Sequence, residues 1–166
     1  MKVAVLMGSP SDKDKMAAAT TTLGDLGVEV DERVLSAHRT PDAVATFAKG
    51  ARAAGYAAVI CGAGMAAHLA GAVAAHTTLP VVGVPLSGGA LNGVDALYAT
   101  VQMPRGVPVA TVAVDGSLNA ALLVVQMLAI TDERLAAALD ERRARAASAV
   151  ARESGTSAGQ SRELGQ

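Results

Sequence analysis

The sequence predicts an α/β fold, and three observations support that prediction. Short apolar runs alternate along the chain with longer segments of helical periodicity. The short runs are continuously apolar, which is typical of parallel strands that are buried on both faces. Loops rich in glycine, serine, histidine or asparagine follow four of these runs. We therefore expect a parallel sheet with helices on both faces, a three-layer αβα sandwich of the flavodoxin-like or Rossmann-like kind.

The expected elements follow one another in β-α order. The strands are 2–7, 28–35, 57–61, 81–84 and 107–112. The helices are 11–26, 41–54, 66–77, 92–102 and a longer helical region at 117–151. This last region should break near Thr131-Asp132-Glu133, because Thr131 can cap a new helix and two acids suit its first turn.

The length of 166 residues fits one domain. We expect a single catalytic domain over 1–152, C-terminal helix included, followed by a disordered tail at 153–166 that has almost no apolar content. Hydrophobic residues make up 51% of the chain but aromatic residues only 2%, so the core must be built from small aliphatic side chains. Each of these buries little area. The chain is therefore expected to gain further burial by self-association.

Composition and motifs exclude several classes of function. The net charge is −1 and there is no basic stripe, so nucleic acid is not an expected partner. No apolar stretch of about 18 residues is uninterrupted, and the N-terminus does not resemble a signal peptide, so we expect no membrane association and a cytoplasmic protein. The three histidines and the single cysteine, Cys61, lack metal-ligand spacing, and Cys61 is expected to be a buried, inert thiol. Neither a Walker A motif nor a dinucleotide fingerprint is present, so ATP and NAD are not supported as cofactors.

The loop after the first strand, Gly8-Ser9-Pro10-Ser11-Asp12, could bind a phosphorylated sugar. Ligands of open parallel sheets bind beyond the carboxyl ends of the strands. Hydroxyls of Ser9 and Ser11 beside a helix start suit a phosphate, and Asp12 could accept hydrogen bonds from sugar hydroxyls. A plain helix cap explains these residues equally well.

The loop after the second strand contains an adjacent histidine and arginine. Thr40 is typical of a helix cap and Pro41 of the first helical position. His38 and Arg39 then lie at the carboxyl edge of the sheet, where an arginine can hold an anion and a histidine can exchange protons. A surface histidine and a solvated arginine are the alternative, and we favour the functional interpretation.

Two further loops are rich in glycine. The loop 62–71 offers a backbone-lined wall, and its small side chains leave room for a planar ligand. His68 in this loop either lines the pocket or holds the loop by hydrogen bonding, and we favour the supporting role. The loop 87–95 leads into a helix that Pro104 ends, and ordinary turn chemistry would explain it.

These segments, taken in order, resemble the N5-carboxyaminoimidazole ribonucleotide mutase family (class I PurE). The resemblance covers roughly residues 2–130. It is carried by Met7-Gly8-Ser9-x-Ser11-Asp12, Ser36-Ala37-His38-Arg39-Thr40-Pro41, Gly62-Ala63-Gly64-x-Ala66-Ala67-His68-Leu69, Gly83-Val84-Pro85, Gly93-Val94-Asp95-x-Leu97-Tyr98, Val101-Gln102-Met103-Pro104-Arg105-Gly106-x-Pro108-Val109 and Asn119-Ala120-Ala121-Leu122-Leu123.

The resemblance implies an isomerase of purine (IMP) biosynthesis that moves a carboxylate from the exocyclic nitrogen to ring carbon 4 of an aminoimidazole ribonucleotide. It implies a homo-octamer with neither metal nor organic cofactor, and a small-molecule ribonucleotide as substrate. It makes His38 the proton-transfer residue. It also implies a substrate-binding set, comprising Ser9, Ser11, Asp12, Ser36, Arg39, Gly64, Ala66, His68 and Leu69.

Two positions depart from the family pattern, and two other functions remain open. The family usually has glycine at Met65 and proline at Ala70; neither change removes a reactive group. One alternative function is the sister phosphoribosylaminoimidazole carboxylase, which uses free CO2. The other is a non-catalytic flavodoxin-like nucleotide-binding module, against which the scarcity of aromatic residues argues.

Overall fold

The computed structural model describes residues 1–153. Contacts within the chain divide it into two units, the first running from Met1 to Met127 and the second beginning at Leu128. The single domain expected over 1–152 stays a prediction. Of the tail expected to be disordered, 154–166 lies outside the described residues.

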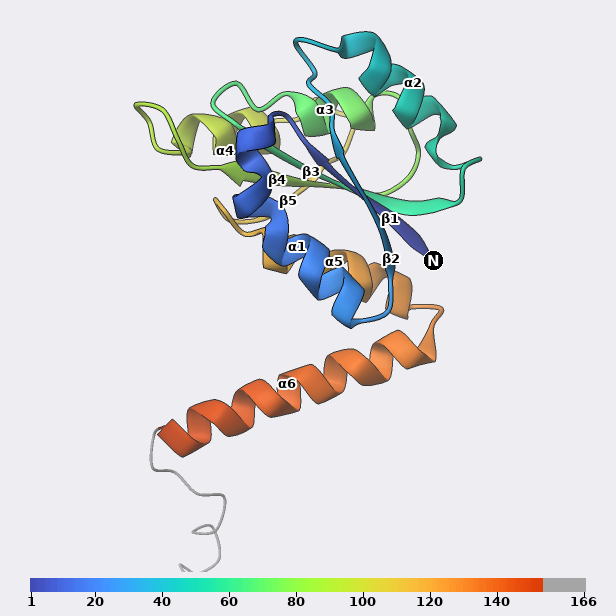
Figure 1. Cartoon of the computed structure of the whole chain (residues 1–166), viewed down its shortest axis with the longest axis vertical. Helices are drawn as coiled ribbons and strands as arrows, with labels where there is room; N and C mark the ends of the chain where they lie inside the picture. Colours follow the sequence, from blue (N-terminus) through green and yellow to red (C-terminus); the bar gives the residue numbers. More distant parts are fainter. Residues whose placement is uncertain (154–166) are drawn as a thin grey trace, which may run out of the picture. The chain divides into compact units, whose positions relative to one another are not determined.

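The first unit is built on a five-stranded sheet with the order β2-β1-β3-β4-β5, in which every pair of neighbours is parallel. The chain lays β2 on one side of β1 and then crosses to place β3 on the other side (Figure 1). The expected α/β class and parallel sheet are thus confirmed. The strands are β1 (Lys2–Met7), β2 (Glu29–Val34), β3 (Tyr56–Gly64), β4 (Val81–Leu86) and β5 (Ala110–Thr111).

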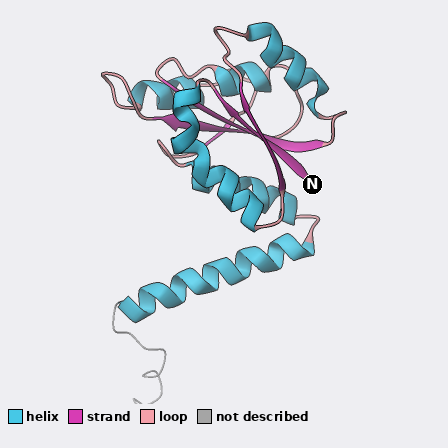
Figure 2. Cartoon of the chain, viewed as in Figure 1, coloured by secondary structure: helices cyan, strands magenta, loops and turns pink. Residues whose placement is uncertain are grey.

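Helices cover both faces of this sheet, as Figure 1 and the colouring of Figure 2 show. Helices α1 and α5 lie on one face, and α2, α3 and α4 lie on the other. The helices are α1 (Lys13–Asp25) after a short 3₁₀ turn η1 (Pro10–Asp12), α2 (Pro41–Ala51), α3 (Leu69–Ala74), α4 (Val94–Val101), α5 (Ser117–Ala129) and, in the second unit, α6 (Glu133–Glu153).

Successive side chains of the central strands point to opposite faces of the sheet, and this alternation explains why helices pack on both faces. In β1, Ala4 and Leu6 join the core beneath α2 and α3. Gly62 of β3 faces the other way, and a Cβ added there would lie 2.4 Å from the Sδ atom of Met16 in α1. The small residue in the strand therefore allows α1 to pack closely on the sheet. Cys61 belongs to the same buried core, and burial raises the pKa of its thiol, as expected for an inert cysteine.

Several boundaries differ from those predicted. Strand β3 continues through Gly64, because 62–64 pair with 84–86 of β4, so the expected third loop is shorter. The fifth strand shrinks from the predicted 107–112 to two residues. The prediction that Thr131 caps the last helix is wrong. Asp132 does so, because its Oδ1 atom accepts hydrogen bonds from the backbone N–H groups of Arg134 (3.0 Å) and Leu135 (3.2 Å).

Strand β2 forms one edge of the sheet and is largely exposed. Its sequence contains four charged residues among six, Glu29, Asp31, Glu32 and Arg33. Asp31 accepts a hydrogen bond from the Nε atom of Arg33 at 2.8 Å. Among the helices of residues 1–153, none has the length and apolar character needed to cross a bilayer.

Candidate active site

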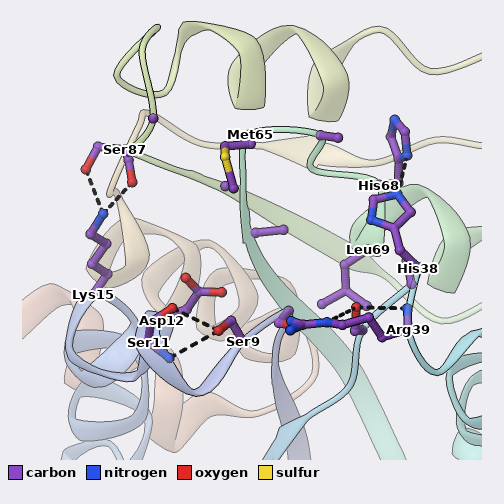
Figure 3. A pocket seen from close by; sticks show the side chains of 18 residues that line it. Ser9, Ser11, Asp12, Lys15, His38, Arg39, Met65, His68, Leu69 and Ser87 are labelled. Atoms are coloured by element: carbon purple, nitrogen blue, oxygen red, sulfur yellow. Dashed lines mark hydrogen bonds between the residues drawn. The ribbon is translucent and has the colours of Figure 1, made fainter.

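A cavity of about 760 Å³ opens at the carboxyl ends of β1, β2, β3 and β4 (Figure 3). It lies where the strand order reverses, between β1 and β3, and there the N–H group of Gly8 donates to the carbonyl of Gly62 at 3.1 Å. Open parallel sheets bind ligands at this position. The lining residues are Gly8, Ser9, Ser11, Asp12, Lys15, Ser36, Ala37, His38, Arg39, Ala63, Gly64, Met65, Ala66, His68, Leu69, Ser87, Gly88 and Gly89.

The first loop presents hydroxyls and a carboxylate to the cavity. Ser9 caps η1: its Oγ atom accepts from the Ser11 N–H group at 3.3 Å and from the Ser11 hydroxyl at 2.8 Å. Asp12 makes no capping hydrogen bond with its side chain. Its carboxylate is therefore not used by its own helix.

Burial sets the behaviour of Asp12. Partial burial raises the pKa of its carboxyl group above 3.8, although a backbone hydrogen bond of Ser9 and the charges of Lys15 and Arg39 oppose the change. The carboxylate thus lies between two cations in a partly desolvated site. Such a group gains from accepting new hydrogen bonds.

The second loop fixes the orientation of Arg39. Its guanidinium donates to the carbonyl of Gly8 at 2.8 Å and to the Oγ atom of Ser36 at 3.3 Å. Thr40 does not use its hydroxyl as a helix cap; it donates to the carbonyl of Ser36 and accepts from the N–H group of the same residue. Helix α2 begins at Pro41 as predicted. Arg39 is therefore held beside the first loop while further N–H groups remain for an anion.

The two histidines of the cavity are in direct contact. The Nε2 atom of His38 lies 2.8 Å from the Nδ1 atom of His68, and the rings meet edge to face with centroids 4.9 Å apart. One nitrogen must donate and the other accept, so the pair holds one hydrogen between the two rings. A proton can therefore move at this contact.

Two further cavity residues are Lys15, which the sequence did not single out, and Ser87, whose loop was interpreted as ordinary turn chemistry. Lys15 extends from the first turn of α1 and donates to the carbonyl and to the hydroxyl oxygen of Ser87, the latter at 2.9 Å (Figure 3). One feature of the sequence could have indicated Lys15. This lysine places a positive charge near a helix N-terminus, where the helix dipole disfavours it, so a specific partner was to be expected.

Met65, which stands where the family resembled by the sequence usually has glycine, lies in the wall of the cavity. Met65 has a φ of 50°, a left-handed conformation that is uncommon for a residue other than glycine. Its side chain is 59% exposed and lies beside Gly89, since a Cβ added to Gly89 would be 3.3 Å from the Cγ atom of Met65. Met65 thus spans from the third loop to the loop after β4.

Comparison with known proteins places this site in a family. The family model described as AIR carboxylase matches residues 2–149.

The chain belongs to the AIR carboxylase family.

Two curated relatives and one solved structure illustrate the similarity. N5-carboxyaminoimidazole ribonucleotide mutase of Brucella melitensis is 55% identical over 141 residues, which are 84% of this chain and 87% of that protein. Phosphoribosylaminoimidazole carboxylase of Saccharomyces cerevisiae is 53% identical over 130 residues, which are 78% of this chain and 23% of that protein. The crystal structure of PurE from Treponema denticola has a TM-score of 0.85 at 26% identity, covering 93% of this chain and 96% of that one.

The match to the AIR carboxylase family spans every loop of the cavity. All ten residues named from the sequence as catalytic or substrate-binding line this one cavity, while their individual roles stay predictions. Between Met1 and Glu153, no three histidine, cysteine, aspartate or glutamate side chains gather closely enough to hold a metal ion.

Proposed function

We propose that this protein catalyses the N5-carboxyaminoimidazole ribonucleotide mutase reaction. The substrate would be 5-carboxyamino-1-(5-phospho-D-ribosyl)imidazole and the product 5-amino-1-(5-phospho-D-ribosyl)imidazole-4-carboxylate, an intermediate of purine (IMP) biosynthesis. The observation that carries the proposal is the 55% identity to a relative of that name over 87% of its length. The cavity supports it, because groups suited to a phosphorylated sugar and to proton transfer line the same space.

The substrate phosphate and ribose fit the side of the cavity built by the first two loops. Arg39 supplies a positive charge in a fixed orientation, and Ser9, Ser11 and Ser36 supply hydroxyls beside it. Asp12 accepts hydrogen bonds from the ribose hydroxyls. This arrangement directs the imidazole ring toward the opposite wall, where the histidines and the third loop lie.

The reaction moves one carboxylate and leaves the proton count unchanged. The bond between the exocyclic nitrogen and the carboxylate carbon breaks, CO2 leaves, and the nitrogen takes up a proton. Ring carbon 4 then attacks CO2, and the hydrogen on that carbon leaves as a proton. His38 supplies the first proton and accepts the second, and His68 holds its ring through the 2.8 Å contact.

Two effects would accelerate the proposed reaction. General acid–base catalysis by a positioned histidine typically raises the rate of a reaction by 10²–10⁴-fold. Holding CO2 beside the nucleophilic carbon adds proximity. Gly64 and Ala66 have small side chains or none, so they leave room for CO2 next to the ring.

The alternatives are less favoured. The sequence identity to the yeast carboxylase is comparable, at 53%, but the match covers only 23% of that protein. A flavodoxin-like flavin or nucleotide module would use aromatic stacking. Phe47 and Tyr56 instead pack against each other with centroids 5.3 Å apart, and neither lines the cavity.

The deciding experiment supplies the carboxyamino ribonucleotide without ATP or bicarbonate and follows formation of the 4-carboxylate by absorbance. The mutase should complete this conversion unaided. A parallel reaction with the uncarboxylated ribonucleotide and bicarbonate tests the carboxylase. Efficient turnover only in that second reaction would reverse the assignment.

We further infer a cytoplasmic homo-octamer. Helix α4 and the preceding loop expose apolar side chains that are between 47% and 61% accessible: Leu91, Val94, Tyr98 and Val101. The last three follow helical spacing and share one face. Burial of this face between copies of the chain supports self-association; the subunit number and the compartment rest on the family resemblance.

A further inference from the structure

Lys15 makes a contact that the proposed chemistry does not use. Its ammonium group donates to both oxygens of Ser87, the first residue after β4. Two of its three N–H groups are thereby occupied within the protein. Neighbouring Lys13, by contrast, points to Glu32 at the surface, 3.5 Å away.

This contact is part of a closed circuit of hydrogen bonds. The N–H group of Ser87 donates to the Oδ1 atom of Asp115 at 2.9 Å, and the N–H group of Asp115 donates to the carbonyl of Pro85 at 2.9 Å. Ser117, at the start of α5, donates its N–H to the carbonyl of Asp115 at 3.0 Å and its hydroxyl to the carbonyl of Lys15 at 2.6 Å. The circuit joins α1, the loop after β4 and the start of α5.

Electrostatics reinforces the same circuit. Burial alone would raise the pKa of Asp115, but the hydrogen bonds from Ser87 and the charge of Lys15 outweigh it and lower that pKa. Asp115 therefore stays ionised and keeps its bond to the Ser87 backbone. Lys15 acts on Ser87 both directly and through Asp115.

The segment held by this circuit has few other supports: Met65 lies beside Gly89, and Gly93 lies close to the backbone of Ser87. Gly88 and Gly89 have φ values of 144° and 61°, and a Cβ added at Gly88 would meet nothing within 4 Å. Glycine has more backbone freedom to lose than any other residue, so ordering this wall is costly. Both glycines line the cavity.

We propose that Lys15 is a positioning residue of the active site, whose ammonium group fixes the segment Ser87–Gly89 as a preformed wall of the cavity. The inference rests on the proposed function, because the wall matters only if the cavity binds the ribonucleotide. Lys15 acts through Ser87 and makes no direct contact with the substrate. Its removal should therefore weaken substrate binding more than it slows chemistry.

The first test measures amide hydrogen exchange of the substrate-free protein. Lys15→Met should accelerate exchange of the Ser87 amide, which donates to Asp115, while α1 and β1 stay as protected as in wild type. Lys13→Met is the matched control, with the same charge change two residues away, and should leave the Ser87 amide unchanged. Unaltered exchange in Lys15→Met would overturn the proposal. Lys15→Gln serves the same test if the methionine variant does not fold.

The second test compares steady-state kinetics. Lys15→Met should raise KM by roughly fivefold or more, the order expected when even one backbone residue must be ordered on binding, with kcat within about twofold. Lys15→Arg should restore most of the loss, because it keeps the charge and the donors. A loss of binding with normal exchange at Ser87 would make Lys15 a direct ligand and refute the positioning role. If wild-type protein does not convert the substrate, the proposed function fails, while the exchange measurement still decides whether Lys15 orders the wall.

Discussion

The contact between His38 and His68 makes their chemical roles unequal. The facing nitrogens are 2.8 Å apart and share one hydrogen, so a second proton on that contact would place two donors face to face. Only one ring can accept a proton from the substrate while the other supports it. Since His38 follows β2 beside Arg39 and the first loop, we propose that His38 is the residue that transfers the proton.

Substitution of the two histidines tests this assignment. His38→Asn keeps polarity but cannot carry a proton, so the rate should fall by roughly 10²-fold or more with ribonucleotide binding retained. His68→Asn should reduce the rate less, because it removes support and leaves the proton carrier. The measurement is single-turnover conversion together with ligand binding by calorimetry. A dead His68 variant beside a nearly normal His38 variant would exchange the two roles.

We predict that the Asp12 carboxylate lowers the stability of the folded protein while it strengthens binding of the ribonucleotide. Its pKa is raised in the folded state, so folded protein holds this proton more tightly than unfolded protein and loses stability as the pH rises above about 3.8. Asp12→Asn removes that ionisation. Its melting temperature at pH 7 should exceed that of wild type, and the advantage should shrink as the pH falls and the Asp12 carboxyl group takes up its proton. The same variant should bind the ribonucleotide more weakly. A wild-type protein that is the more stable at pH 7 would contradict this account.

Loop residues were predictable where strand, turn and residue type coincide. Ser9, Asp12, His38 and Arg39 follow directly after apolar runs, so their place at the carboxyl edge follows from the parallel sheet. Lys15 was not predictable, because it is one of two lysines at the start of α1. Only the tertiary fold brings it into contact with Ser87, which lies 72 residues further along the chain.

At the scale of elements, α3 and α4 approach β4 closely because Gly83 lacks a side chain. An added Cβ would lie 2.3 Å from the Cγ2 atom of Thr100, 3.1 Å from Val109 and 3.3 Å from the Cβ atom of Ala70. Thr100 cannot easily turn away, since it is buried and its hydroxyl donates to the carbonyl of Ala96 at 2.7 Å.

Gly83→Ala should therefore destabilise the fold by about 1–3 kcal/mol, the usual cost of overpacking a core. The change would be measured by urea denaturation. Gly50→Ala in α2 is the control: nothing lies within 4 Å of its added Cβ, and alanine should stabilise the helix by roughly 0.5–1 kcal/mol. Equal stability of the Gly83 variant and wild type would mean that α4 shifts freely over the sheet.

Element order was predictable, while several boundaries depended on tertiary pairing. Glycines suggested a loop at 62–64, but pairing with β4 makes these residues strand. The two-residue β5 is short for the opposite reason, since only Ala110 and Thr111 find partners in β4. The apolar character of 107–112 indicated that the segment would be buried. It could not indicate how many of its residues would form backbone pairs with the neighbouring strand.

For the whole molecule, we predict that the C-terminal segment is dispensable for assembly and chemistry. The segment after Arg152 contains few apolar residues, whereas the exposed apolar face of α4 lies near the middle of the chain. A chain ending at Arg152 should keep the oligomeric mass and the rate of the full chain. Sedimentation or light scattering, with activity measured in parallel, checks both. Smaller species would show that this segment takes part in subunit contacts.

The charged edge strand β2 has a consequence for the chain before it meets other copies. A newly made protein exposes both the unpaired backbone of this edge and the apolar face of α4. A second chain that added a strand at β2 would place its side chains beside Glu29, Asp31, Glu32 and Arg33, whose hydration would then be reduced. In the self-association that we propose, the charged sheet edge disfavours contacts between copies and the α4 face favours them, so that closed assemblies form in preference to fibrous aggregates.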